Sequence, residues 1–210
     1  MDFLVSLYIL CLALSELMGG KTFHILDIGN FSLNASPAIF IIPVLFSIND
    51  IITEVFGKER AQSVVRSGFF MVLFLLIFSV IATALPPSGR FLETENAYDT
   101  IFGTSARVAT ASLIAFTTSE FLDIYIFYRI RKKLGEQALW FRNNLSNFIA
   151  QFVDSFVFIF LAFYAFEKSL ANNWVFLISL ILPYWFLRCF MSIIETPFVY
   201  MGVKWLKDAK

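Results

Sequence analysis

The chain has 210 residues, of which 59% are hydrophobic, including 27 phenylalanines. A soluble domain of this length needs fewer apolar residues to fill its core, so the composition excludes an ordinary soluble protein and predicts an integral membrane protein. The 16 basic and 16 acidic residues give a net charge of zero, which does not suggest a nucleic-acid-binding surface.

Six apolar segments predict the membrane-spanning helices. An α-helix needs about 20 residues to cross the hydrocarbon of a bilayer, and each segment except the somewhat short first approaches or exceeds that length. The connections between them are short, so we expect an all-α, polytopic membrane protein with six transmembrane helices in a single domain, residues 1–210. The expected helices cover residues 3–19, 35–56, 67–85, 105–128, 146–166 and 174–205.

The basic residues predict the orientation, because Lys and Arg accumulate in cytoplasmic loops. Eleven of the sixteen follow the second or fourth helix or lie in the C-terminal tail, and only three lie in the opposite loops. Both termini are therefore expected in the cytoplasm. The N-terminal segment lacks the basic start and the clear small-residue cleavage site of a signal peptide, which indicates a retained first helix.

The sequence predicts no metal site, no cofactor and no catalytic residue. Cys11 and Cys189 lie inside expected helices and match no metal-binding or redox spacing, as is typical of small buried apolar residues. The single histidine, His24, stands in an outer loop with no second ligand nearby.

Seven acidic residues lie in or at the ends of the apolar segments. A charge at bilayer depth costs about 2.5–3.5 kcal/mol on insertion scales, so such residues usually face a polar cavity or a partner. They therefore predict a protein that moves or binds a polar molecule inside the membrane. The seven are Glu16, Asp50, Glu54, Glu120, Asp123, Asp154 and Glu195.

Helical spacing places polar side chains on single faces of four helices, because residues three, four, seven or eight positions apart share a face. At about 1.5 Å per residue, one acid on each of these helices lies roughly 10 Å inside the cytoplasmic boundary. We therefore expect the four helices to converge on one cavity. The expected faces are Ser47, Asp50 and Glu54; Phe116, Glu120, Asp123 and Phe127; Asn143, Asn147, Gln151 and Asp154; and Tyr184, Arg188, Ser192 and Glu195.

A purely structural role is the alternative for each of these groups. Glu54, Arg107 and Glu195 can anchor helix ends at the membrane interface, and the two acids of the fourth helix can pair with Arg188. Glu16 has no other charged residue nearby on the same face of its helix that would indicate a site, so a purely structural role is favoured for it more than for the others.

Three ordered motifs lie between residues 43 and 165. An Asp-x-x-x-Glu-x-x-Gly-Lys motif begins at Asp50, an Arg-x-x-x-Ala-Ser motif begins at Arg107, and a Trp-x-Arg-Asn-Asn-x-Ser motif begins at Trp140 and continues to Gln151 and Asp154. As a set, these stretches resemble the queuosine precursor transporters, also called the vitamin uptake transporter family.

The resemblance implies import of a 7-deazaguanine across a bacterial inner membrane for transfer RNA modification. The expected substrates are 7-cyano-7-deazaguanine, 7-aminomethyl-7-deazaguanine and queuine. A guanine-like edge offers adjacent N–H donors to a carboxylate, and its carbonyl oxygen accepts from a donor such as Gln151 or an arginine. Its flat ring stacks on Phe or Tyr side chains.

The expected site follows from the polar faces and the motifs together. Its substrate-binding residues are Asp50, Glu54, Phe116, Glu120, Asp123, Gln151, Asp154, Tyr184, Arg188 and Glu195, and its gating or structural residues are Arg107, Ser112, Arg142, Asn143 and Ser146. A titrating acid, Glu54 or Glu120, would couple uptake to protons, whereas passive entry followed by trapping needs no ion. The other expected partner is the lipid bilayer, and Phe-rich lipid-facing surfaces permit a homodimer.

Three other functions stay open at this point. A substrate-binding subunit of an energy-coupled vitamin or nucleobase importer would also have about six short helices and no nucleotide-binding motif. An intramembrane protease is disfavoured, because the sequence has no Gly-x-Gly-Asp segment and no Ser–His pair. A purely structural membrane protein does not account for polar faces on four helices.

Overall fold

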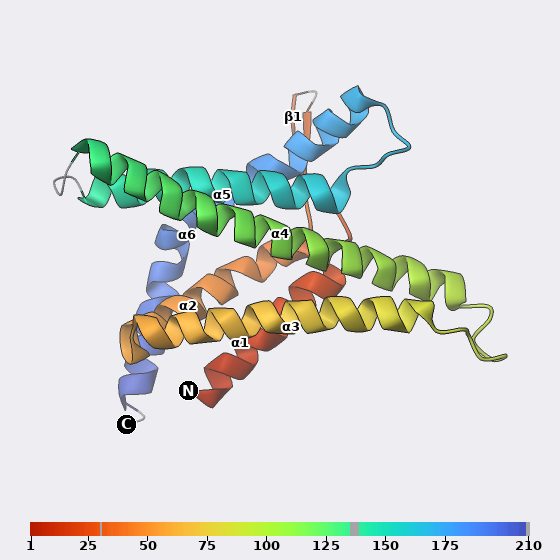
Figure 1. Cartoon of the computed structure of the whole chain (residues 1–210), viewed down its shortest axis with the longest axis horizontal. Helices are drawn as coiled ribbons and strands as arrows, with labels where there is room; N and C mark the ends of the chain where they lie inside the picture. The colour runs from red at the N-terminus through yellow and green to blue at the C-terminus, as the bar shows by residue number, and fades with distance from the viewer. Residues whose placement is uncertain (30, 135–138, 209–210) are drawn as a thin grey trace.

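The computed structural model describes residues 1–29, 31–134 and 139–208, and it is mostly helical (Figure 1). The elements of this part of the chain are, in order, α1 (Asp2–Met18), β1 (Phe23–Ile28), β2 (Phe31–Ala35), the 3-10 helix η1 (Pro37–Phe40), α2 (Ile42–Phe56), α3 (Lys58–Ala84), α4 (Glu95–Leu134), α5 (Leu139–Phe163) and α6 (Leu170–Asp208).

Three helical stretches are long and apolar enough to cross a membrane: Pro37–Phe56, Glu59–Ala84 and Leu170–Phe190. A shorter apolar helix covers Phe148–Phe163. The prediction of several membrane crossings is therefore supported, while the full set of six crossings stays a prediction.

Several helices extend beyond their expected apolar segments. The third was expected over residues 67–85, but α3 begins at Lys58, and the fourth was expected over 105–128, but α4 covers Glu95–Leu134. The backbone hydrogen bonds of a helix do not depend on apolar side chains, so a helix can continue into polar sequence. Gly57 separates α2 from α3 with a φ of 87°, a value that favours glycine, and its N–H donates to the Thr53 carbonyl over 3.0 Å.

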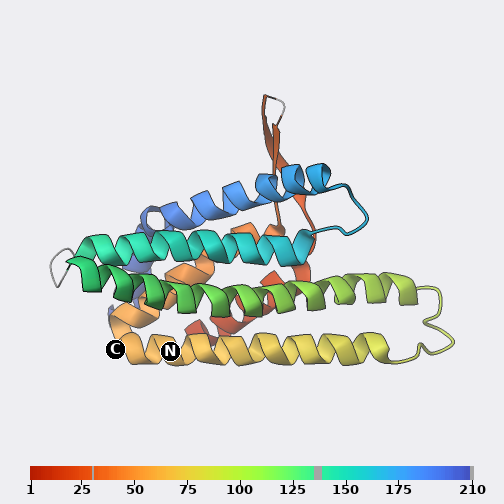
Figure 2. The ribbon, with the colours of Figure 1, turned by 45° about the horizontal axis from the view of Figure 1, so that its top comes forward.

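A β-hairpin between α1 and η1 corrects the all-α expectation. β1 and β2 pair antiparallel, with Gly29 at a φ of 61° in the turn, and the hairpin projects away from the helices (Figure 2). His24 lies in β1, where its Nε2 atom is 3.4 Å from Asp27 Oδ2. The Asn34 side chain donates to Ser179 Oγ over 2.8 Å, which joins β2 to α6.

The helices pack in a defined order around the centre of the molecule. α4 packs against both α3 and α5, while α2 packs against α6, and α1 contacts α2, α3 and α4. α6 changes direction along its length (Figure 1) and contains Pro183 and Pro197, which are residues that kink helices. Both termini lie at the same end of the molecule as the α2–α3 junction and the C-terminal end of α4 (Figure 2).

Small buried residues let α4 and α5 approach closely. Val108 and Ala111 of α4 and Ala162 of α5 form one buried cluster. Small side chains are typical of close helix–helix contacts in membranes. This contact positions the polar residues of the two helices beside each other.

Candidate functional site

A cavity of about 420 Å³ lies between the helices, and all six α-helices contribute to its wall. Its size falls within the range of about 300–1,000 Å³ that is usual for small-molecule sites. The aromatic lining includes Phe46, Phe116 and Phe158. The polar lining includes Ser15 and Glu16 of α1, Asn49 of α2, Ser112 and Ser119 of α4, Gln151 and Asp154 of α5, and Tyr184 and Arg188 of α6.

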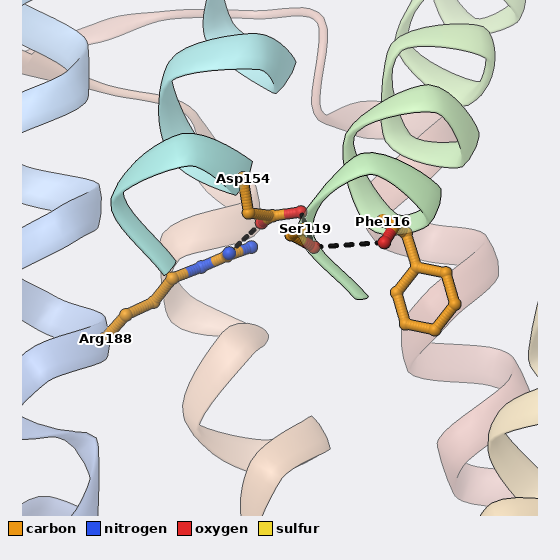
Figure 3. Close-up of polar contacts among 4 residues, drawn as sticks. All are labelled: Phe116, Ser119, Asp154 and Arg188. Atoms are coloured by element: carbon orange, nitrogen blue, oxygen red, sulfur yellow. Dashed lines mark hydrogen bonds and ion pairs between the residues drawn. The ribbon is translucent and has the colours of Figure 1, made fainter. Parts of the chain in front are cut away.

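An ion pair between Asp154 and Arg188 joins α5 to α6 at the cavity wall (Figure 3). The Arg188 side chain is 20% exposed and that of Asp154 is 13% exposed, so the pair is largely shielded. The second carboxylate oxygen, Oδ1, is 3.3 Å from Ser119 Oγ on α4. The Ser119 hydroxyl also lies 3.0 Å from the Phe116 carbonyl, so its single proton is shared between two acceptors.

Glu16 occupies the same cavity but has a different environment. The residue is only 3% exposed, and its Oε2 atom has no hydrogen-bond partner among the described residues. The side chain of Ser112 is its polar neighbour on α4. A buried carboxylate without a full set of partners is costly, which marks Glu16 as a functional candidate.

Three further expected residues line the cavity. Tyr184 is 3% exposed, and its hydroxyl donates over 3.4 Å to the carbonyl of Ser36, the residue that follows β2. The Phe116 ring lies 6.1 Å from that of Phe69 between ring centres. The Gln151 side chain also faces the cavity, so the wall offers aromatic surfaces together with both donors and acceptors.

Comparison with known protein families shows which family this chain belongs to. A family model described as "Putative vitamin uptake transporter" matches residues 36–202, most of the chain. The chain belongs to the vitamin uptake transporter family. Its members are transporters and not enzymes, and the transporter described here is accordingly a membrane protein with several candidate spans.

Three curated relatives resemble this vitamin uptake transporter. A "Probable queuosine precursor transporter" of Bacillus subtilis is 28% identical over 85% of this chain and 76% of its own length. A protein of the same name from Haemophilus influenzae is 27% identical over 69% of this chain, and the "Queuosine precursor transporter" of Escherichia coli is 25% identical over 65% of it. The chain spans 59% of the length of each of these two. No solved structure matches the chain.

The transporter places its three sequence motifs differently with respect to the cavity. In the first motif, Asp50 and Glu54 are exposed on α2 and do not line the cavity, whereas the neighbouring Asn49 does. The third motif contributes Gln151 and Asp154, both in the wall.

The two ends of the second motif have different roles, one in joining helices and the other in lining the cavity. Arg107 donates from Nε to the Leu161 carbonyl over 2.8 Å and from a terminal nitrogen to the Tyr164 carbonyl over 2.6 Å. These carbonyls belong to the C-terminal end of α5, where helix carbonyls lack intrahelical partners. Arg107 therefore caps α5 from α4, while Ser112 faces the cavity.

The remaining expected site residues have side chains outside the described part of the transporter. They are Glu120, Asp123, Arg142, Asn143, Ser146 and Glu195. Among the residues that are described, no group of three or more His, Cys, Asp or Glu is placed to hold a metal ion. The expectations for these six residues stay predictions.

The cavity residues that the sequence analysis left out of the site include Glu16, Asn49, Ser15 and Ser119. Glu16 carried a signal, since an acid in an apolar segment is a functional candidate by itself. The other three are neutral and common in helices, and no spacing separates them from residues that simply face a neighbouring helix.

Proposed function

We propose that this protein imports queuosine precursors, the 7-deazaguanines 7-cyano-7-deazaguanine, 7-aminomethyl-7-deazaguanine or queuine, for transfer RNA modification. The observation that carries the proposal is the central cavity, in which polar groups and aromatic rings from different helices face one space. The three relatives are named for queuosine precursors, which supports the same substrate class.

The cavity chemistry suits a flat, polar heterocycle. Burying the polar edge of such a base without partners costs roughly 2–7 kcal/mol per polar group. Gln151 and Arg188 offer donors to a ring carbonyl, Glu16 offers an acceptor to ring N–H groups, and Phe116 and Phe158 offer stacking surfaces. An apolar molecule would leave these polar groups unsatisfied, so the lining favours a nucleobase-like substrate.

The mechanism we propose is alternating access, in which the helices open the cavity first to one side of the membrane and then to the other. The Asp154–Arg188 pair links α5 to α6, and the Ser119 contact links α5 to α4, so these helices present their donors together. Relative movement of α1 and α2 against this group would change access to the cavity. Transport by this route needs no ion unless an acid exchanges a proton during the cycle.

For the membrane arrangement we propose six crossings of a bacterial inner membrane with both termini in the cytoplasm. The α2–α3 junction, the C-terminal end of α4 and both termini lie at one end of the molecule (Figure 2), and eleven of the sixteen basic residues belong to these regions. A fluorescent protein fused after residue 210 is expected to fluoresce in the cytoplasm, whereas an exported alkaline phosphatase fused there is expected to be inactive. The reverse pattern would refute the orientation.

The experiment that tests the function uses a bacterial host that cannot make queuosine precursors. The host receives nanomolar deazaguanine, and queuosine in its transfer RNA is measured with and without this chain. Restoration only when the chain is expressed supports import. If queuosine stays absent although the protein is present in the membrane, the proposed substrate is wrong.

A second measurement separates a self-sufficient transporter from a subunit of an energy-coupled importer. Purified protein in liposomes should take up a radiolabelled precursor alone, without an ATPase partner. Collapse of an imposed proton gradient then shows whether uptake depends on protons. Binding without uptake in liposomes would favour the subunit instead.

A further inference from the structure

Glu16 presents an unused acceptor in the cavity. Its carboxylate is buried, and among the described residues Oε2 has no hydrogen-bond partner. The Asn49 Oδ1 atom, which also belongs to a cavity-lining residue, lacks a partner in the same part of the chain. Buried polar groups are nearly always hydrogen-bonded, so these atoms indicate a ligand that brings N–H donors with it.

Asp154 is not equivalent to Glu16, although both are carboxylates in one cavity. The two oxygens of Asp154 are both engaged, one by Arg188 and the other by Ser119. A ligand donor gains less at an oxygen that already accepts a hydrogen bond than at the unpartnered Oε2 of Glu16. Of the two carboxylates, Glu16 is therefore the better acceptor for substrate.

The cavity also offers an unpartnered donor. The Arg188 Nε–H has no partner among the described residues, while a terminal nitrogen of the same guanidinium holds Asp154. The α4 neighbours of the two acids, Ser112 and Ser119, are seven residues apart and share one helix face. This spacing corresponds to roughly 10 Å along the axis, so the two acids contact α4 at different levels of the cavity.

We infer that Glu16 recognises the edge of the substrate that carries adjacent N–H groups, and that Arg188 recognises the ring carbonyl. This inference rests on the proposed function and specifies which group selects the substrate. A ring N–H and an exocyclic amino group together match the two oxygens of a carboxylate. Glu16 therefore disfavours purine-like compounds that lack the exocyclic amino group, because they offer the carboxylate one N–H donor in place of two.

The test uses the purified full-length protein and two probes, 7-aminomethyl-7-deazaguanine and the same compound without its 2-amino group. Binding is measured by radioligand competition in detergent. The wild type should prefer the complete compound by at least about 100-fold, since sites built around a hydrogen bond strongly reject analogues that lack it. In Glu16→Gln, affinity for the complete compound should fall at least about tenfold, and the preference should fall below about tenfold.

A matched control carries the same chemical change outside the cavity. Glu59→Gln neutralises an exposed acid in the first turn of α3 and should keep both the affinity and the preference of the wild type. If Glu16→Gln does not elute as a folded protein, Glu16→Asp replaces it. That variant keeps the charge but withdraws the carboxylate, so it should also lose affinity and preference.

The outcomes separate the inference from the proposed function. If the wild type binds neither compound, both are wrong. If the wild type binds and prefers the complete compound, while the Glu16 variants keep this preference, the proposed function stands and the role of Glu16 is refuted. Loss of preference in a folded Glu16 variant, with Glu59→Gln unchanged, supports the inference, since a merely structural residue would not alter discrimination between two ligands.

Discussion

Neutralising Asp154 should destabilise the protein because it leaves Arg188 without its charge partner. The pair is largely shielded and joins α5 to α6. In Asp154→Asn the side chain keeps its shape, but the Arg188 guanidinium loses the carboxylate that compensates its burial. The double variant, Asp154→Asn with Arg188→Gln, removes both charges and should recover much of the lost stability.

The expected magnitude follows from the burial of the pair. Truncating one partner of a buried, hydrogen-bonded charge pair costs about 2–5 kcal/mol, much of it from the charge that remains unpaired. Because the Asp154 and Arg188 side chains are 13% and 20% exposed, the lower part of this range applies, about 2–3 kcal/mol. For a chain of about 200 residues that corresponds to a decrease of roughly 4–12 °C in melting temperature.

The assay is thermal unfolding in detergent followed by the fluorescence of the four tryptophans. All four members of the double-mutant cycle are melted under one condition, so that the coupling between the two sites is obtained directly. A positive coupling, with the double variant more stable than Asp154→Asn, supports the reasoning. Additive losses would refute it, because they would mean that the two charges do not depend on each other.

Three other variants test separate parts of the structure. A Cβ atom on Gly20 would lie 2.5 Å from Thr104 Cγ2, so Gly20→Ala should lower the free energy of unfolding by about 1–3 kcal/mol in a thermal melt. Adding Thr104→Ser, which removes that methyl group, should restore the lost stability, and an absence of rescue would contradict the contact. Arg107→Gln should lower the melting temperature, because it removes the cap of α5, and should leave substrate affinity unchanged. A loss of affinity with normal stability would instead place Arg107 in the substrate site. Phe116→Ala should weaken substrate binding about tenfold in the radioligand assay if its ring stacks on the base, and equal affinity would exclude that role.

The helical part of the fold was predictable because each apolar segment carries its own signal. The helix ends were not, since a helix can continue into polar sequence, as α3 does between Lys58 and Ser67, so a change in hydropathy does not mark the end of the helix. The hairpin did have a signal in the sequence, a Gly-Asn pair between two short runs with apolar residues, Phe23–Ile28 and Phe31–Ala35. The sequence analysis treated this region as an outer loop between membrane segments and therefore did not predict the hairpin.

The site was predictable only in part, because helical spacing shows which residues share a face but not which face turns inward. On α2, Asp50 and Glu54 share a face that is exposed, while Asn49, about 100° further round the helix, lines the cavity. The inward face is set by packing, here through the buried Ile48 and Ile52. The sequence analysis paired Arg188 with the acids of the fourth helix, whereas the structure pairs it with Asp154, because spacing within one helix does not show which residues of two helices meet.

The two carboxylates of the cavity should respond in opposite ways to the same loss of charge. Asp154 has partners on both oxygens, so Asp154→Asn should lower stability. Glu16 is buried with an unpartnered oxygen, so Glu16→Gln should raise the free energy of unfolding of the empty protein by about 1–3 kcal/mol. That gain corresponds to an increase of roughly 2–12 °C in melting temperature. Stability gained together with binding lost is typical of a residue retained for function. Both variants are melted without ligand, with Glu59→Gln as the control. A decrease for Glu16→Gln would show that its carboxylate has partners in the empty protein, and it would remove the reason for assigning Glu16 to the substrate.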